Sequence, residues 1–335
     1  MRDIEERVSL AADFIVALQQ PDGAILALPD GALDPWDHVE SAMALDAAGR
    51  HDAAASAYQW LAGQQHEDGG LWSAYRYPEP VMECRESHGA SYLAVGAWHH
   101  YLATGDRDWL AAYWPTVQRA LGFALELQAE SGEVHWARDR DGAIWRDTLV
   151  AGAASVRAAL RCGEWAAEVL DEPVAALWRE AWRRVDGSFA KEPSWGESFP
   201  DRAGRHAMHW YYPVLTGVAG GQQARDRLLS EWPRFIIDRY GCRCVDNRPW
   251  VTLAESAELT IALDAAGLGE EARRLLGWQW ERQQSSGGFP MGTALGFGEW
   301  PPGEHTSWTA AAIVLATDSC YGLSPAGGLF RSLAI

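Results

Sequence analysis

The chain has 335 residues, of which 48% are hydrophobic and 22% charged, and its 46 acidic against 28 basic residues give a formal net charge of −18. This hydrophobic content supplies a sizeable core and argues against a disordered chain. The acidic balance leaves no basic stripe that could neutralise phosphates, so a nucleic-acid partner is not expected. No apolar run approaches the length of about 18 residues that a transmembrane helix needs, so no membrane span is expected.

The N-terminus and the cysteines indicate a cytoplasmic protein. Residues 1–7 carry acidic side chains and lead into an amphipathic helix, unlike a secretory signal peptide. The five cysteines are an odd number at spacings that indicate neither a disulfide framework nor a zinc site. We therefore expect reduced thiols, no metal and no cofactor, and the sequence carries no signal for an oligomeric state.

Two short fragments recur along the chain. Self-similarity of this kind indicates one supersecondary unit that is used several times. The first fragment stands at Gln19-Gln20-Pro21-Asp22-Gly23, Gln64-Gln65-His66-Glu67-Asp68-Gly69-Gly70 and Gln283-Gln284-Ser285-Ser286-Gly287-Gly288, with a weaker copy at Gln128-Ala129-Glu130-Ser131-Gly132. The second stands at Ala44-Leu45-Asp46-Ala47-Ala48-Gly49 and Ala262-Leu263-Asp264-Ala265-Ala266-Gly267.

The repeated unit is a predicted helical hairpin, and strand signals are nearly absent. Apolar spacing near 3.6 predicts charged-faced outer helices at 7–19, 53–65, 109–128, 174–185, 223–239 and 270–284. Segments rich in small residues predict closely packed inner helices at 35–48, 88–103, 148–169, 206–220, 252–266 and 305–318. We expect an all-α fold, a single (α/α)6 toroid domain of six helical hairpins over residues 1–335.

The connections of this toroid differ between its two faces. Each loop from an outer helix to the next inner helix is long and carries Trp, Tyr, carboxylates, His and Arg, whereas the opposite connections are short. All inner-helix N-termini then meet at one rim around a central funnel. Long, decorated loops on a rigid scaffold are typical of a functional face.

The first inner helix opens with candidate site residues. Asp34 is expected as its N-cap and Pro35 at its first position. Asp37 and Glu40 are three residues apart on one helix face, so both can point into the funnel, beside Trp36. The alternative is that Asp37 caps the helix and Glu40 is a hydrogen-bonded acid of the core.

The fifth and sixth inner helices open with further carboxylates. Thr252 and Glu255 fit a capping box, which by itself explains Glu255, but an acid or base at this rim is an equal alternative. Glu304 stands in a Pro-Pro-Gly loop that is expected to cover the funnel mouth. We expect Glu255 and Glu304 to be the acid and base, with Glu40 as a further catalytic candidate. The expected substrate-binding residues are Asp37, Trp36, His38, Trp72, Tyr75, Arg76, Asp147, His209, Tyr211, Arg248, Trp250, Glu299 and Trp308.

A funnel of carboxylates and indoles suits carbohydrate chemistry. Pyranose rings stack on Trp, and two carboxylates across a cleft supply the acid and base of glycosidic cleavage. We expect a glycosidase-like enzyme for a small or non-reducing-end saccharide. One alternative is an isoprenoid cyclase or prenyltransferase, because aromatic walls also stabilise cations, although no Asp-rich diphosphate cluster is visible. Another is a sugar-binding toroid without catalysis.

Residues 34–128 resemble the catalytic barrel of six-hairpin glycosidases of the glucoamylase type. The stretches that carry the resemblance include Asp34-Pro35-Trp36-Asp37, Asp68-Gly69-Gly70-Leu71-Trp72 and Tyr113-Trp114-Pro115-Thr116-Val117. The resemblance implies that Trp36-Asp37 holds the terminal sugar and that the base precedes the last inner helix, at Glu299 or Glu304. The general acid of that family is a Glu in a Trp-Glu element, where this chain has Trp145-Arg146-Asp147.

The Gln-Gln-x-x-Asp-Gly-Gly fragments look equally like those of prenyltransferases and of squalene or terpene cyclases. Over its whole length the chain is similar to bacterial proteins labelled prenyltransferase on this repeat. The resemblance implies the toroid, and it implies an isoprenoid substrate only as the alternative, because a repeat that determines a fold does not define a site.

Overall fold

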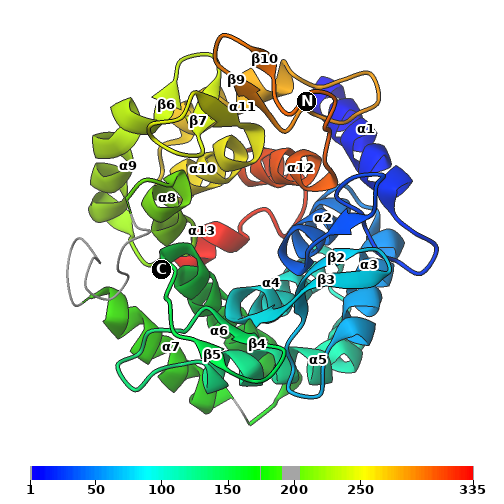
Figure 1. The fold of residues 1–335 in the computed structure, drawn as a ribbon, viewed down its shortest axis with the longest axis vertical. Coiled ribbons are helices and arrows are strands. Elements are labelled where there is room, and N and C mark those ends of the chain that lie inside the picture. The colour runs from blue at the N-terminus through cyan, green and yellow to red at the C-terminus, as the bar shows by residue number, and fades with distance from the viewer. Residues whose placement is uncertain (1, 174, 191–203, 335) are drawn as a thin grey trace.

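The computed structural model describes residues 2–173, 175–190 and 204–334, and Figure 1 shows two concentric rings of helices. The inner ring consists of α2 (Pro35–Ala47), α4 (Ser87–Thr104), α6 (Val150–Leu170), α8 (Ala207–Leu215), α10 (Leu253–Ala265) and α12 (Ser307–Tyr321). The outer ring consists of α1 (Arg2–Leu18), α3 (His51–Gln64), α5 (Arg107–Glu126), α7 (Ala175–Phe189), α9 (Gly221–Phe235) and α11 (Gly269–Trp280). The expected inner and outer helices are thereby confirmed.

The two rings differ in composition because they differ in burial. The inner helix α4 is buried almost all round, and its Gly96 lies so close to Tyr58 and Val39 that a Cβ would meet each at 2.7 Å. Outer helices such as α9 bury one stripe and expose the rest, as amphipathic helices do. The ring closes where α1 packs on α12, which also contacts α2 and α10.

Within the residues that the structure describes, the long loops build two antiparallel five-stranded sheets at the rim. The first has the order β1 (Ala32–Leu33), β2 (Trp72–Arg76), β3 (Glu79–Glu86), β4 (Ala137–Asp139) and β5 (Ile144–Trp145). The second has the order β10 (Gly298–Glu299), β9 (Gly292–Ala294), β8 (Trp250–Thr252), β7 (Gly241–Arg243) and β6 (Ile236–Ile237). The register pairs Cys84 with Asp139 in the first sheet and Val251 with Thr293 in the second.

These sheets correct the expectation of a strictly all-α fold. The strands are two to eight residues long, so most are too short for a recognisable alternation of apolar and polar residues. Each sheet also joins loops of different hairpins, and such pairing depends on the toroid bringing the loops together.

The recurrent glutamine–glycine fragment is a clip between consecutive outer helices. Gln65 Nε2 donates to the carbonyl of Gly69 in its own turn, at 3.1 Å, and to that of Thr116 in α5, at 3.0 Å. The corresponding pairs of acceptors are Gly23 and Ala53 for Gln19, Gly132 and Ala181 for Gln128, and Gly287 and Arg7 for Gln283. The weaker copy at Gln128 therefore makes the same contacts as the others.

The glycine of each clip is required by contact as well as by conformation. Gly69 has a φ of +90°, and a Cβ there would lie 2.0 Å from the carbonyl oxygen of Arg119 in α5. The equivalent glycines Gly23, Gly132 and Gly287 also have positive φ and abut a backbone carbonyl of the next outer helix. The repeat is therefore explained by helix packing and needs no ligand.

The short helix α13 (Leu329–Leu333) contacts α8 and α10, and it lies within the outline of the ring in Figure 1. Along the described ranges, no helix combines the length and the apolar character needed to cross a membrane.

Candidate functional site

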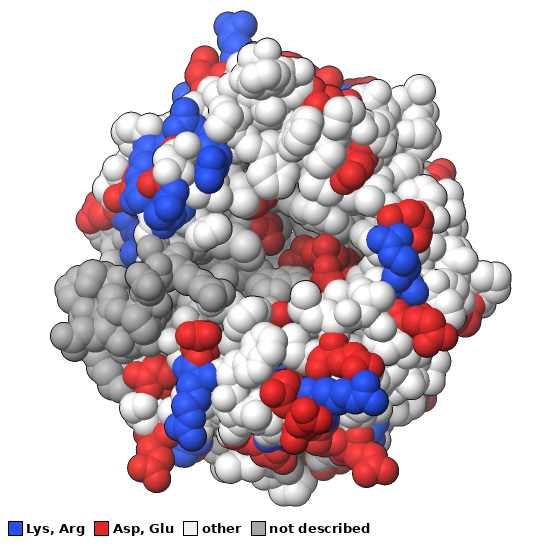
Figure 2. All heavy atoms as spheres, in the orientation of Figure 1, with Lys and Arg blue, Asp and Glu red and all other residues white. Residues whose placement is uncertain are grey.

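A cavity of about 540 Å³ opens at the rim that the long loops surround. Figure 2 shows the central hollow, with acidic side chains inside it. Every inner helix contributes to its wall at or near its N-terminus. Its described lining includes Asp34, Trp36, Asp37, Glu40, Leu71, Ser73, Met82, Glu86, His88, Leu149, Gly152, Met208, Glu255, Glu258 and Trp308.

Two aspartates begin the first inner helix, and they interact with each other. Asp34 is the N-cap of α2, as expected, and its carboxylate accepts a hydrogen bond of 3.0 Å from the backbone N–H of Asp37. Burial raises the pKa of the Asp37 carboxyl well above its ordinary value, and the neighbouring acids Asp34, Glu40 and Glu258 raise it further. The site therefore favours the protonated form of Asp37.

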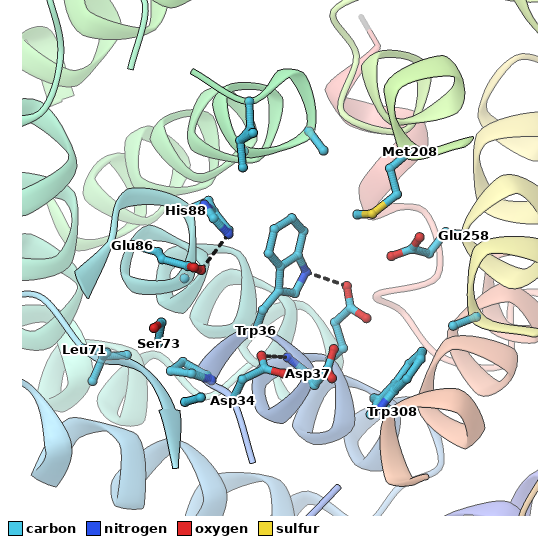
Figure 3. Close-up of a pocket in the computed structure, with 18 of the residues that line it drawn as sticks. Asp34, Trp36, Asp37, Leu71, Ser73, Glu86, His88, Met208, Glu258 and Trp308 are labelled. Atoms are coloured by element: carbon cyan, nitrogen blue, oxygen red, sulfur yellow. Dashed lines mark hydrogen bonds and ion pairs between the residues drawn. The ribbon is translucent and has the colours of Figure 1, made fainter. Parts of the chain in front are cut away.

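Trp36 stands in the middle of the cavity, and Glu40 holds it there (Figure 3). Its indole N–H donates to Oε1 of Glu40 at 2.9 Å, and the Tyr92 hydroxyl donates to the same oxygen at 3.2 Å. Burial raises the pKa of Glu40 to about 7, against the opposing effect of these two hydrogen bonds. The rings of His88, Tyr92 and Tyr212 surround the indole at centroid distances of 4.8, 5.2 and 5.5 Å.

Two glutamates of α10 complete an acidic cluster with the carboxylates of α2. The Thr252 hydroxyl donates to the carboxylate of Glu255, and the Tyr211 hydroxyl donates to that of Glu258. Burial, followed by the charge of Glu40, raises the pKa of Glu258 well above its ordinary value. Thr252 is the N-cap of α10, but its side chain makes no capping bond to the helix backbone, which corrects the expected capping box.

A separate ion pair lies on the other side of Trp36. Nε2 of His88 is 3.0 Å from Oε2 of Glu86, and both side chains line the cavity (Figure 3). Burial opposes ionisation of Glu86, yet the hydrogen bond and charge of His88, with a contribution from the Trp136 indole, hold the pKa of Glu86 below its ordinary value. The surroundings therefore favour the ionised form of Glu86 on one side of Trp36 and the protonated forms of Asp37 and Glu258 on the other.

The structure brings several of the expected residues together and places others elsewhere. Trp36, Asp37, Glu40, Glu255 and Trp308 line the cavity, and Tyr211 holds Glu258. The expected residues that are not part of the described lining are His38, Trp72, Tyr75, Arg76, Asp147, His209, Tyr211, Arg248, Trp250, Glu299 and Glu304.

The contacts of these outlying residues explain their positions. His38 and Tyr75 are buried and both contact Trp60, with ring centroids 5.1 and 5.7 Å from it. Arg76 forms an ion pair with Asp30 at 2.8 Å. Three of the others make side-chain contacts: Trp72 with His66 and Arg85, Trp250 with the carbonyl of Trp300, and Glu299 with Gly303 and His305. Four make backbone hydrogen bonds: the carbonyl of His209 with Arg227, that of Asp147 with Trp136, that of Glu304 with Met291, and the N–H of Arg248 with Val245.

Sequence reasoning missed Glu86 and Glu258 and regarded Asp34 only as a cap. Glu258 follows Glu255 by three residues, so the sequence could have indicated that both lie on the same face of the helix. Glu86 directly precedes the second inner helix, which indicated the rim, but its contact with His88 at the cavity was not visible in the sequence. Among the described residues, no group of three or more His, Cys, Asp or Glu side chains is arranged to hold a metal ion.

Comparisons with known proteins find glycosidases. The MMP endo-(1,4)-3-O-methyl-alpha-D-mannosidase of Mycolicibacterium hassiacum is 37% identical over 328 residues, which are 98% of this chain and 90% of that protein. A GH63 mannosylglycerate hydrolase from Thermus thermophilus, solved with glucose, has a TM-score of 0.74 at 14% identity, over 91% of this chain and 98% of its own. A wild-type glycosidase has a TM-score of 0.76 at 14% identity, over 96% and 97% of the two chains. No family model matches the chain.

At 14% identity these two structures share their fold with this chain, and that fold is the six-hairpin toroid of glycosidases. The resemblance to six-hairpin glycosidases is thereby confirmed, whereas the comparisons give no support to the prenyltransferase resemblance. The glutamines of the clips join outer helices and are not part of the described cavity lining, so the repeat shared with prenyltransferases does not define the site.

Proposed function

Because this chain belongs to the family of the MMP endo-(1,4)-3-O-methyl-alpha-D-mannosidase and is a glycoside hydrolase, we propose that it cleaves internal α-1,4 linkages of 3-O-methylated mannose oligosaccharides. The 37% identity over almost the whole chain supports this substrate. The endo mode of the relative favours internal cleavage over the non-reducing-end preference that we expected from the sequence.

The single observation that carries the mechanism is the convergence of α2 and α10 carboxylates at one cavity. The charge of Glu258 contributes to the raised pKa of Asp37, although the two residues are far apart in the sequence. A glycosidase needs one carboxyl that is protonated and one that is ionised. Within this cluster we assign the proton donor to Asp37, whose surroundings favour its protonated form.

We assign the base to Glu255. It lies in the first turn of α10, where the helix dipole favours a negative charge, and it accepts the hydrogen bond of the Thr252 hydroxyl. Glu258 is less suited to this role because burial and Glu40 favour its protonated form. Glu304, which the sequence favoured, lies outside the described lining of the cavity. In the reaction, Asp37 gives its proton to the glycosidic oxygen as the bond to the anomeric carbon breaks, and Glu255 accepts a proton from the water whose oxygen bonds to that carbon and becomes the hydroxyl of the new hemiacetal.

The wall of the cavity suits a methylated sugar. Leu71, Met82, Leu149 and Met208 present apolar surface beside the carboxylates. A methyl ether removes a hydroxyl donor and adds apolar area, so it gains from such a surface and loses little there.

The test is hydrolysis of a synthetic α-1,4-linked tetrasaccharide of 3-O-methylmannose, with mass spectrometry of the products. Internal cleavage yields disaccharides from the wild type. Asp37→Asn and Glu255→Gln are each expected to reduce kcat by about 10²–10⁴-fold, whereas Glu304→Gln keeps kcat close to the wild-type value. Release of monosaccharide only, or loss of turnover in Glu304→Gln with retention in Glu255→Gln, would contradict the proposal.

A further inference from the structure

The pair of Glu86 and His88 has no place in the acid–base chemistry assigned to α2 and α10. Glu86 ends β3 and is the N-cap residue of α4, but its side chain makes no capping bond to that helix. Its backbone is fixed by pairing with Ala137 of β4. The backbone of Glu86 is therefore fixed at the cavity wall, and its carboxylate is not used to cap α4.

The surroundings of the pair keep Glu86 available to a ligand. The side chain of Glu86 retains 20% of its exposure, whereas that of His88 retains 9%. His88 donates to Oε2 through Nε2, and the indole of Trp136 also bonds to the Glu86 carboxylate, so both hold the side chain in place while it lines the cavity. A carboxylate with this pattern accepts hydrogen bonds and donates none.

The neighbourhood of His88 is shaped to keep the imidazole in this position. A Cβ at Gly152 of α6 would lie 3.1 Å from Nδ1 of His88, so a side chain there would push on the ring by a few tenths of an ångström. On the other side, the indole of Trp36 packs edge-to-face on His88 at a centroid distance of 4.8 Å. Two elements far apart in the sequence thus enclose the ring.

We propose that Glu86 is a substrate-binding residue that accepts a hydrogen bond from a free hydroxyl group of the sugar, on the opposite side of Trp36 from Glu258, and that His88 positions it (Figure 3). This inference rests on the proposed function, because it takes a saccharide as the ligand. A methyl ether has no hydroxyl proton to donate, so the hydroxyl that reaches Glu86 must be unmethylated. The pair therefore selects where along the sugar ring methylation is tolerated.

The experiment uses the full chain with the tetrasaccharide of 3-O-methylmannose and with analogues that lack one free hydroxyl per sugar ring, either O2 or O6. On the wild type, one of the two deoxy analogues is expected to lose about tenfold to hundredfold in kcat/KM, the usual worth of a hydrogen bond to a charged group. On Glu86→Gln the parent substrate loses a similar factor, mostly through KM. The same deoxy analogue then loses a smaller factor than on the wild type, because a neutral amide oxygen accepts a weaker hydrogen bond than the carboxylate that it replaces.

Two further variants separate positioning from folding. Gly152→Ala pushes on His88 without removing a polar group and is expected to reproduce the rise in KM with little change in kcat. Glu83→Gln is the matched control, since Glu83 lies on the same strand β3 but pairs with Arg140 at 2.6 Å outside the described cavity lining. Its KM is expected to stay at the wild-type value.

Binding measured by titration calorimetry distinguishes the two levels of failure. The role of Glu86 is overturned, while the proposed function stands, in either of two cases. In the first, Asp37→Asn binds the tetrasaccharide and adding Glu86→Gln does not weaken that binding. In the second, each deoxy analogue loses the same factor in kcat/KM on Glu86→Gln as on the wild type. If the protein neither binds nor cleaves the tetrasaccharide, the proposed substrate is overturned, and the role of Glu86 falls with it.

Discussion

The indole N–H of Trp36 donates a hydrogen bond of 2.9 Å to Oε1 of Glu40, one turn further along α2. This contact makes the aromatic surface at the centre of the cavity depend on a buried acid. It also gives Glu40 a role as a positioning residue, which differs from the catalytic role expected from the sequence.

Glu40→Gln tests which role is correct. The amide oxygen can still accept from Trp36 and Tyr92, so we expect folding to be preserved and kcat/KM to fall by less than about tenfold. Glu40→Leu removes the acceptor of both donors and leaves the buried Tyr92 hydroxyl unpaired, which costs about 1–3 kcal/mol in stability. Steady-state kinetics and thermal melting of both variants measure these effects. A loss of kcat in Glu40→Gln as large as that in Asp37→Asn would make Glu40 the acid or base.

The pH dependence of kcat/KM is expected to report Asp37 on its basic limb. The donor must be protonated, so activity is lost as the pH rises through the raised pKa of Asp37. After burial, the charge and hydrogen bond of Asp34 are the next causes of that rise. Asp34→Asn keeps a capping side chain, so it should lower the pKa of Asp37 and move the basic limb to lower pH. Glu258→Gln removes a weaker contribution and should move the limb less, and an unchanged limb in Asp34→Asn would argue against Asp37 as the donor.

Gly69→Ala and Gly142→Ala separate conformational strain from steric contact. The two glycines have φ values of +90° and +91°, but a Cβ at Gly142 meets nothing within 4 Å, whereas one at Gly69 would lie 2.0 Å from a backbone oxygen. Gly142→Ala should lower the free energy of unfolding by about 1–2 kcal/mol, and Gly69→Ala by more than about 4 kcal/mol, if it folds at all. Denaturant unfolding measures both, and equal losses would show that the clip contact is not tight.

Acid should destabilise the protein through His38. Burial lowers the pKa of His38 to about 3, and the unfolded chain has the ordinary value near 6.5. The unfolded state therefore binds the proton first as the pH falls, and the stability contributed by neutral His38 is lost progressively from about pH 6.5 towards pH 3. Between pH 7 and pH 5 this amounts to about 2 kcal/mol.

His38→Phe is the control for this loss. Phe does not titrate and can keep the ring contact with Trp60, at a centroid distance of 5.1 Å in the native pair. The variant should therefore lose less stability than the wild type between pH 7 and pH 5 in denaturant titrations. Equal losses in the two proteins would assign the acid sensitivity to other groups, such as His99, whose pKa burial lowers to about 4.

The order and approximate bounds of the helices were predictable because helical periodicity is local. The first inner helix was expected at 35–48 and is Pro35–Ala47, with Asp34 as its N-cap and Pro35 at its start. The glutamine–glycine fragments were also visible as a repeat, but their role was not. Gln65 bonds to Thr116, 51 residues away, and no local pattern identifies that acceptor.

The sequence by itself determined the toroid, the rim and the presence there of carboxylates and indoles, since each of these follows from spacing within one helix or loop. Only the tertiary structure decided which side chains share the cavity. His38 and Trp36 are two residues apart, yet the helix turns His38 outward to Trp60 while Trp36 enters the cavity. Tyr92 meets Glu40 across 52 residues, and Tyr211 meets Glu258 across 47. Such contacts depend on how separate hairpins pack around the ring, so no local stretch of sequence encodes them.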